Sequence, residues 1–180
     1  MSENNNQSLG DLFPGVAHDN TESLATVRRV PNEPGMAAKV FTLLAEAGVN
    51  VDMIVQASAS TGTADISFTV PGSAAAKVRD VLQEKQDELG YQSFDIDANV
   101  GKVAVVGVGM KTHSGLAAKF FNALSDEGVN VLMISTSEIR IAALVPLEQL
   151  QDAVRALWKP WCMAVLVADA IPRNNNRKKT

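Results

Sequence analysis

A segment of about twenty residues occurs twice in this chain, eighty positions apart. The sequence GMAAKVFTLLAEAGVNVDMI begins at Gly35 and GLAAKFFNALSDEGVNVLMI begins at Gly115, and twelve of the twenty aligned positions are identical. A repeat of this length indicates a duplicated structural unit, into which every other motif must fit. The 180 residues are therefore expected to form two small domains of one fold.

Each unit has the pattern of strand, helix, strand, strand, helix, strand. In the first unit strands are predicted over 25–30, 50–59, 65–70 and 91–96, with helices between 35 and 48 and over 74–89. In the second unit the strands are 102–109, 130–136, 138–144 and 163–168, and the helices 115–127 and 147–157. This order predicts an α+β fold of two ferredoxin-like βαββαβ domains, each an antiparallel four-stranded sheet with helices on one face. The short connection 97–101 predicts that the two domains pack against each other.

The composition argues against several classes of protein. One cysteine, Cys162, and two histidines, His18 and His113, leave no internal disulfide and no zinc-type cluster, so no cofactor and no metal site are expected. A net charge of −4 argues against binding to nucleic acid. No apolar run has the length of a membrane span and the N-terminus lacks the pattern of a secretory signal, so a cytoplasmic location without membrane contact is expected.

The loop 107–115, GVGMKTHSG, lies between a predicted strand and a predicted helix, where phosphate-binding loops occur. Its spacing fits neither G-x-G-x-x-G nor G-x-x-x-x-G-K-[ST], so nucleotide binding is the weakest of three functional hypotheses. No catalytic Ser/His/Asp, Cys/His or paired-carboxylate motif is recognisable. His113 either contacts a ligand, or it is solvated or caps the helix that follows.

Both repeats offer a helix start with free backbone N–H groups, at 35–38 and 115–118, where a glycine lets a carboxylate approach. The turn GVN follows each helix and ends in Asn50 or Asn130, whose amide or nearby carbonyls could meet an ammonium group. Together these groups would suit an amino acid. The alternative is that Gly48 and Gly128 only end the helices and that the asparagines only form turns.

Three motifs carry a family resemblance: VPNEPGMAAKVFTLLAEAGVNVDMIVQ, GMKTHSG followed by MISTSEIRI, and FPGVAHD near the N-terminus. They resemble the C-terminal regulatory region of aspartate kinases, a pair of ACT domains, over about 13–157. In that family, chains of this length exist as separate regulatory subunits. The resemblance implies feedback inhibition by lysine, threonine or both, edge-to-edge pairing of ACT domains into a homodimer, and a catalytic aspartate kinase subunit as a partner. The alternative is a free-standing amino-acid-binding ACT module that regulates another enzyme.

The resemblance also implies a set of effector contacts, matched motif by motif. In the first unit they are Asn32, Pro34, Gly35, Met36, Ala37, Asn50 and Gln56; in the second they are Met110, His113, Ser114, Gly115, Asn130, Val131, Ser135, Thr136 and Ser137.

The family order further places the strand 13–18 in the second sheet. The expected division is therefore a disordered segment 1–12, ACT domain 1 at 25–98, ACT domain 2 at 13–24 plus 99–170, and a disordered basic tail 171–180. Four features depart from the family pattern: Asn32 stands where aspartate is usual, the loop 60–63 is short, Arg29 stands where an apolar residue is usual, and the sequence diverges from Trp158 onward.

Overall fold

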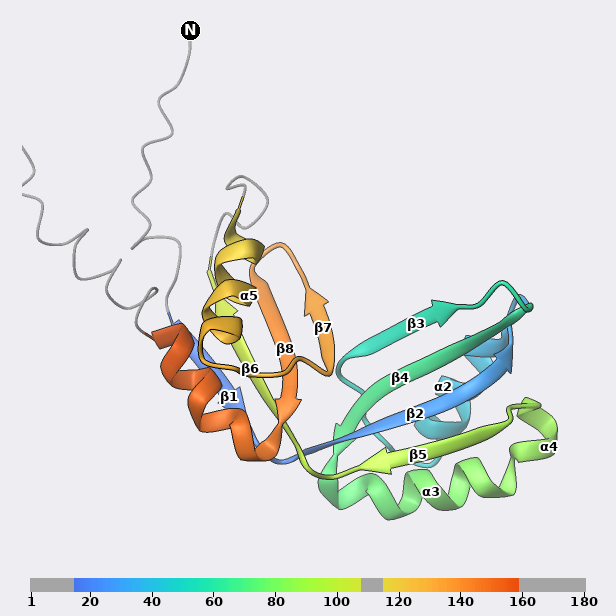
Figure 1. Cartoon of the computed structure of the whole chain (residues 1–180). Helices are drawn as coiled ribbons and strands as arrows, with labels where there is room; N and C mark the ends of the chain where they lie inside the picture. Colours follow the sequence, from blue (N-terminus) through green and yellow to red (C-terminus); the bar gives the residue numbers. More distant parts are fainter. Residues whose placement is uncertain (1–14, 108–114, 159–180) are drawn as a thin grey trace, which may run out of the picture.

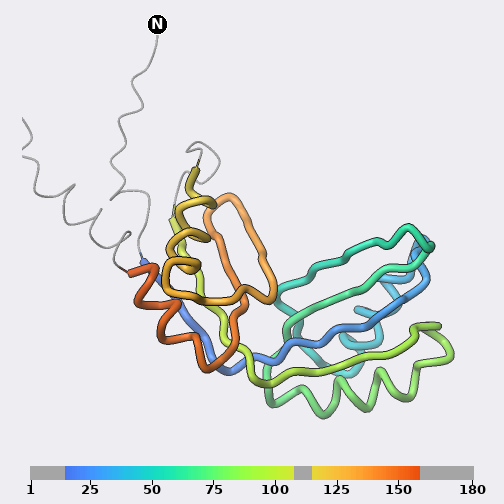
Figure 2. The backbone as a smooth tube through the Cα atoms, in the orientation of Figure 1, coloured from blue at the N-terminus to red at the C-terminus, as the bar shows by residue number. Residues whose placement is uncertain are grey.

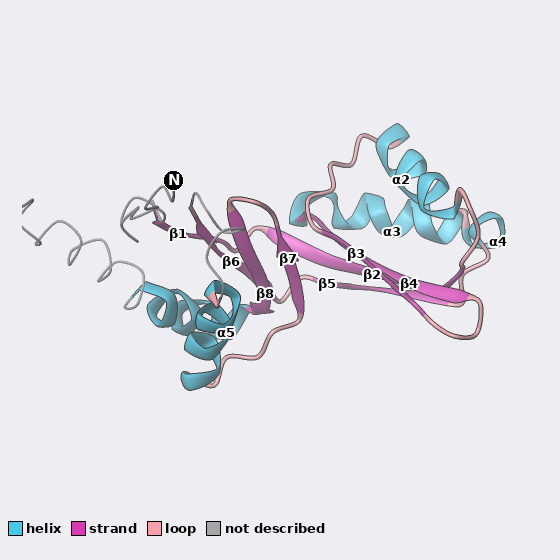
Figure 3. Cartoon of the chain, turned by 90° about the horizontal axis from the view of Figure 1, so that it is seen from above, coloured by secondary structure: helices cyan, strands magenta, loops and turns pink. Residues whose placement is uncertain are grey.

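Two four-stranded antiparallel sheets form the framework of the chain (Figure 1). The computed structural model describes residues 15–107 and 115–158. The helices of each sheet lie on one of its faces, as the view from above makes clear (Figure 3). The predicted fold class, two ferredoxin-like domains, is confirmed.

The first sheet has the strand order β3-β4-β2-β5. Its strands are β2 (Glu22–Pro31), β3 (Ile54–Ser58), β4 (Thr63–Pro71) and β5 (Ser93–Asp97), and its helices are α2 (Met36–Glu46), α3 (Ala75–Glu84) and α4 (Gln86–Leu89), with a 3-10 turn η1 (Gly72–Ala74) before α3. The single helix predicted over 74–89 is wrong in one respect: Lys85, at φ −100° and ψ 14°, separates α3 from α4. We refer to this unit as the first domain.

The second sheet has the order β1-β6-β8-β7. Its strands are β1 (Gly15–Asp19), β6 (Val100–Val106), β7 (Met133–Thr136) and β8 (Arg140–Pro146); α5 (Leu116–Asp126), the 3-10 turn η2 (Leu147–Gln149) and the helical residues 150–158 cover it. The N-terminal strand β1 thus pairs with β6, although the whole first domain lies between these two strands in the sequence. The strand predicted over 163–168 lies outside the described residues.

The strands after the repeated helices begin later than predicted. Those predicted from 50 and 130 start at Ile54 and Met133. In the connection before β3, Val49 and Met53 are buried, at 7% and 3% exposure, so their apolar character reflects core packing rather than strand pairing; before β7, Val129 is buried at 7% but Leu132 is 42% exposed.

Arg29 occupies an apolar position of the family pattern because β2 contains a β-bulge. The register with β4 shifts between Val27 and Val30, and both valines remain fully buried. Arg29 takes the left-handed conformation, at φ 53°, and its N–H donates to Asp65 Oδ1 at 2.8 Å. The extra residue is thereby turned out of the sheet without leaving a valine outside the core.

The chain passes between the two domains twice, over residues 20–21 and 98–99 (Figure 2). The faces that the helices leave uncovered pack against each other along a surface that we call the seam. Its apolar residues are Leu24 and Met53 from the first domain and Val100, Ala104, Met133, Ala142 and Leu144 from the second.

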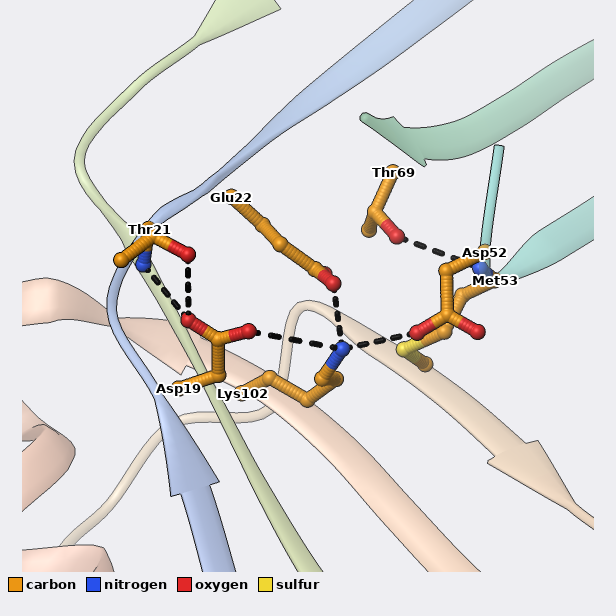
Figure 4. Close-up of polar contacts among 7 residues, drawn as sticks. All are labelled: Asp19, Thr21, Glu22, Asp52, Met53, Thr69 and Lys102. Atoms are coloured by element: carbon orange, nitrogen blue, oxygen red, sulfur yellow. Dashed lines mark hydrogen bonds and ion pairs between the residues drawn. The ribbon is translucent and has the colours of Figure 1, made fainter. Parts of the chain in front are cut away.

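Lys102 of β6 lies at the seam among three carboxylates (Figure 4). Its Nζ donates to Asp52 Oδ2 at 2.7 Å and to Glu22 Oε1, and Asp19 Oδ2 is 4.0 Å away. The Lys102 side chain is 11% exposed. Burial by itself lowers the pKa of Lys102, but hydrogen bonds to Asp52 and Glu22 outweigh it, so the pKa is raised. The same hydrogen bond lowers the pKa of Asp52.

These pKa shifts predict that the seam is weakened by acid. The lowered pKa of Asp52 contributes stability that is present above the unfolded value, about 3.9, and is lost as the pH falls through the folded value. The raised pKa of Lys102 contributes stability that is lost only as the pH rises through a folded value above 10.5. We expect the melting temperature of the native chain to exceed that of Asp52→Asn at pH 6 and the two to converge below pH 4. Asp80→Asn, on the exposed side of α3, is the control; an equal difference at both pH values would contradict the expectation.

Gly101 lets the helical residues 150–158 approach the second sheet. A Cβ built at Gly101 would meet three atoms of the Leu150 side chain at 2.8, 3.0 and 3.1 Å. Gly101→Ala should therefore destabilise the chain by about 1–3 kcal/mol in urea unfolding, through overpacking. Leu150→Ala should cost about 2–5 kcal/mol by itself. The double variant should lose less free energy of unfolding than the sum of the two single losses. Strict additivity would show that this contact does not limit the packing.

Candidate functional site

Both repeated helices start at a glycine, which has no side chain of its own to cap the helix. Gly35 and Gly115 have φ 91° and φ 90°, a conformation that favours glycine. Neither α2 nor α5 has an acidic residue in its first turn. At the start of α2 the Met36 N–H donates to the Glu33 carbonyl at 3.2 Å, and the N–H groups of Ala37 and Ala38, with the positive end of the helix dipole, are left for an anion such as a carboxylate.

Two predicted contacts of the first domain meet beside the start of α2. Gln56 Nε2 donates to Asn32 Oδ1, and Asn32 Nδ2 donates to Ser58 Oγ, each at 3.4 Å. Gln56 pairs with Ile66, a residue of the core under the helices, so it lies on the helix side of the edge strand β3. The Asn32 N–H donates to the Gly62 carbonyl at 3.0 Å, which holds that residue in place. Pro34, Met36 and Ala37 belong to the same region, the turn into α2 and its first residues.

The asparagines of the GVN turns lie at the other end of their helices. Asn50 follows the C-terminus of α2, and the 11 residues of that helix separate it from Gly35 by about 16 Å. Asn130 stands in the same relation to Gly115, because α5 also has 11 residues. A carboxylate site at a helix start and an ammonium site at the following turn are therefore not brought together within one domain.

Ser135 and Thr136 are the last two residues of the edge strand β7, and Ser137 comes directly after it. Thr136 pairs with Ile141, a core residue, and so lies on the helix side of the sheet, like Gln56 in the first domain. Ser135 pairs with Ala142 on the opposite face. Ser135, Thr136 and Ser137 also line a cavity of about 120 Å³ at the seam, with Asp52, Met53, Arg140 and Ala142.

Gln149 is a residue of the second site that the sequence patterns did not indicate. Its Oε1 accepts from the Asn130 N–H at 2.9 Å and its Nε2 donates to the Gly128 carbonyl at 3.4 Å. Gln149 thus holds the GVN turn of the second domain from the adjacent 3-10 turn. Val131, the neighbour of Asn130, packs against the core with its partly buried side chain. Met110, His113 and Ser114 lie outside the described residues.

Both sheets present an apolar edge strand beside these sites. β3 and β7 are the outermost strands of their sheets. Ile54 and Val55 of β3 are 49% and 36% exposed, and Ile134 of β7 is 45% exposed. An edge of this kind carries unpaired backbone N–H and C=O groups and is suited to pairing with another strand. Across residues 15–107 and 115–158, none of the helices is long and apolar enough to pass through a bilayer.

Comparisons with known proteins agree with this geometry. A family model described as the ACT domain matches residues 28–86 and 103–159. The chain is 45% identical to aspartokinases of Corynebacterium efficiens and Corynebacterium glutamicum over 148 residues, which is 81% of this chain and 35% of each of those proteins. It therefore spans about a third of the length of these curated relatives.

Solved structures of similar length also match. In a crystal structure of aspartokinase alpha and beta subunits, one chain matches with a TM-score of 0.78 and 41% identity, covering 83% of this chain and 99% of that one. The ligand-free regulatory subunit of aspartate kinase from Thermus thermophilus matches with a TM-score of 0.77 and 35% identity, covering 82% of this chain and 97% of that one. With the doubled fold and the repeated helix starts, these matches show that the chain belongs to the ACT-domain family, as a tandem ACT protein of the kind found in aspartate kinase regulatory subunits.

Proposed function

We propose that this chain senses lysine, threonine or both, and passes their binding on to a catalytic aspartate kinase as feedback inhibition. The observation that carries the proposal is the repeated pairing of an uncapped, glycine-started helix with an open, apolar edge strand. The membership of the chain in the regulatory-subunit family supports the choice of effector and partner. A cytoplasmic location goes with this role.

The effector sites would be completed by a second copy of the chain. The start of α2 lies beside the later half of β3, where Gln56 is, whereas the Asn130 turn leads into the start of β7. If β3 of one chain pairs antiparallel with β7 of another, the end of β3 meets the start of β7. That arrangement brings the helix start at Gly35 next to the partner's Asn130. By the same geometry, Gly115 and Thr136 would meet the partner's Asn50.

This interface between two chains would have the chemistry that a free amino acid requires. The N–H groups of Ala37 and Ala38 can donate to its carboxylate, and the amide oxygens of Asn32, Gln56 or the partner's Asn130 can accept from its ammonium group. An amide accepts such a hydrogen bond without contributing the charge attraction of a carboxylate. Asn32 should therefore weaken the first site relative to relatives that carry aspartate there.

Inhibition would arise from differential binding. An effector bound between two chains stabilises one arrangement of their sheets, and a catalytic subunit held in that arrangement is less active. The alternative is a free-standing ACT module that uses the same site to regulate another enzyme. Co-purification with a full-length aspartate kinase separates these two possibilities.

Calorimetric titration of the chain tests the proposal directly. Lysine or threonine should release or absorb heat with a saturating isotherm, whereas ATP should give none. Asn32→Asp should tighten the binding at the first site by about tenfold, corresponding to roughly 1.4 kcal/mol from a charge-assisted hydrogen bond. Asn122→Asp makes the same change on the exposed side of α5 and should leave the affinity unchanged. Heat with ATP but with no amino acid would refute the proposal.

The edge pairing has a test of its own. Ile134→Lys puts a charge on the exposed edge strand β7 and should convert the dimer to a monomer, with loss of effector binding, because a lysine at an edge opposes strand pairing. The measurements are multi-angle light scattering and the same titration.

Leu147→Lys provides a matched control, since Leu147 is also an exposed apolar residue, at 36%, and belongs to η2 rather than to either edge strand. This variant should remain dimeric and bind the effector. An Ile134→Lys chain that stays dimeric and binds normally would remove β7 from the proposed interface.

A further inference from the structure

The seam joins equivalent rows of residues from the two sheets. In the first sheet, a row runs across β3, β4, β2 and β5 through Met53, Thr69, Leu24 and Asp97. In the second sheet, the equivalent row runs across β7, β8, β6 and β1 through Met133, Leu144, Lys102 and Asp19. The outer aspartates even share a role: Asp97 and Asp19 each accept, at 2.8 Å, from the N–H two residues further on.

The two rows differ in their charges. Lys102 stands in the second domain where Leu24 stands in the first. The two carboxylates that receive the Lys102 ammonium come from the first domain and also have apolar counterparts. Glu22 pairs with Pro71 as Val100 pairs with Pro146, and the Asp52 N–H donates to Thr69 as the Leu132 N–H donates to Leu144.

We infer from this pattern that the seam is selective for one domain of each kind, and that Lys102, Glu22 and Asp52 determine that selection. A contact of a domain with a copy of itself would bury the same apolar row but would leave the charges unmatched. Two second domains would set Lys102 against Val100 and Leu132. Two first domains would set Glu22 and Asp52 against Leu24. The chain contains the same fold twice, so such a device is needed to keep the domains from pairing with their own kind.

The burial of the charges makes the selection effective. The side chains of Lys102 and Glu22 are only 11% and 13% exposed. An ion that loses its partner at such a place keeps the cost of desolvation without the compensating attraction. Asp52 is 50% exposed and adds a second, better solvated partner, while Asp19 lies at 4.0 Å and Arg140 faces Asp52 from β8. The selection thus depends mainly on the match between Glu22 and Lys102.

Three chains test the inference, each in a Cys162→Ser background. Lys102→Met removes the ammonium group and makes the second domain apolar along its row. The reversed chain, Glu22→Lys with Lys102→Glu, exchanges the signs of the central pair; Asp19→Asn and Asp52→Asn accompany it, so that Asp19 does not repel the new carboxylate and no lysine is placed against Arg140. Lys119→Met, at an exposed position of α5, is the control for Lys102→Met. Far-UV circular dichroism verifies that each chain is folded.

Two measurements decide the outcome. The first is the distance between spin labels on the two domains, at Arg79→Cys of α3 and Asn122→Cys of α5, in labelled chains diluted with unlabelled chains of the same variant. The second is the molar mass at increasing concentration. We expect a single distance peak for the native, control and reversed chains. Lys102→Met should lose that peak and show about a twofold higher mass, because its second domains are free to pair with each other.

The inference is overturned if Lys102→Met keeps the native distance peak and mass, since the charges then select nothing. It is equally overturned if the reversed chain is as broad in distance as Lys102→Met, because the identity of the charged residues would then matter and not their match. Should Lys102→Met fail to fold, Glu22→Gln with Asp52→Asn removes the opposite half of the match and is judged by the same distance criterion.

Discussion

Each sheet of this protein has helices on one face only, and the rest of the structure follows from how the other face is covered. The two uncovered faces cover each other along one row of each sheet, in which Met53 and Met133 take the same place, and beyond that row the face of the first sheet is largely exposed. Small domains bury a low fraction of their surface by themselves, so this mutual cover supplies core that neither half has alone. The start of β7 belongs to the seam through Met133, whereas Ile54 and Val55 of β3 and Ile134 of β7 remain exposed beside it.

The duplication made much of the fold predictable from the sequence. Glycines stand at both ends of the first repeated helix, Gly35 before it and Gly48 after it, and the second copy has glycines at the same places. Both helices were therefore predicted correctly to within a residue or two. The break at Lys85 and the bulge at Arg29 were not predicted. The bulge depends on Asp65, which is 36 residues away, and no local pattern contains such information.

The candidate site was predictable in its parts but not in its assembly. Asn32 and Gln56 are hydrogen-bonded beside the start of α2, although 24 residues separate them. Asn50 and Gly35 lie at opposite ends of α2, because the 11 residues of that helix separate them, and a motif read along the sequence does not give this distance. Lys102 is hidden for a related reason: within an apolar strand it resembles a solvent-facing residue, and only the packing of one domain on the other shows that its partners are Glu22 and Asp52.

The seam and the edge strands are distinct surfaces, yet they are joined by consecutive residues. Met53 is buried at the seam and Ile54, its neighbour, begins the exposed strand β3; Met133 is buried at the seam and is itself the first residue of β7. Asp52, which holds Lys102, directly precedes Met53. A ligand that shifts either edge strand must therefore move a residue of the packed seam, and a packed interface responds by changing between discrete arrangements rather than by stretching. The backbone thus links the exposed edge strands directly to the packed seam between the two domains.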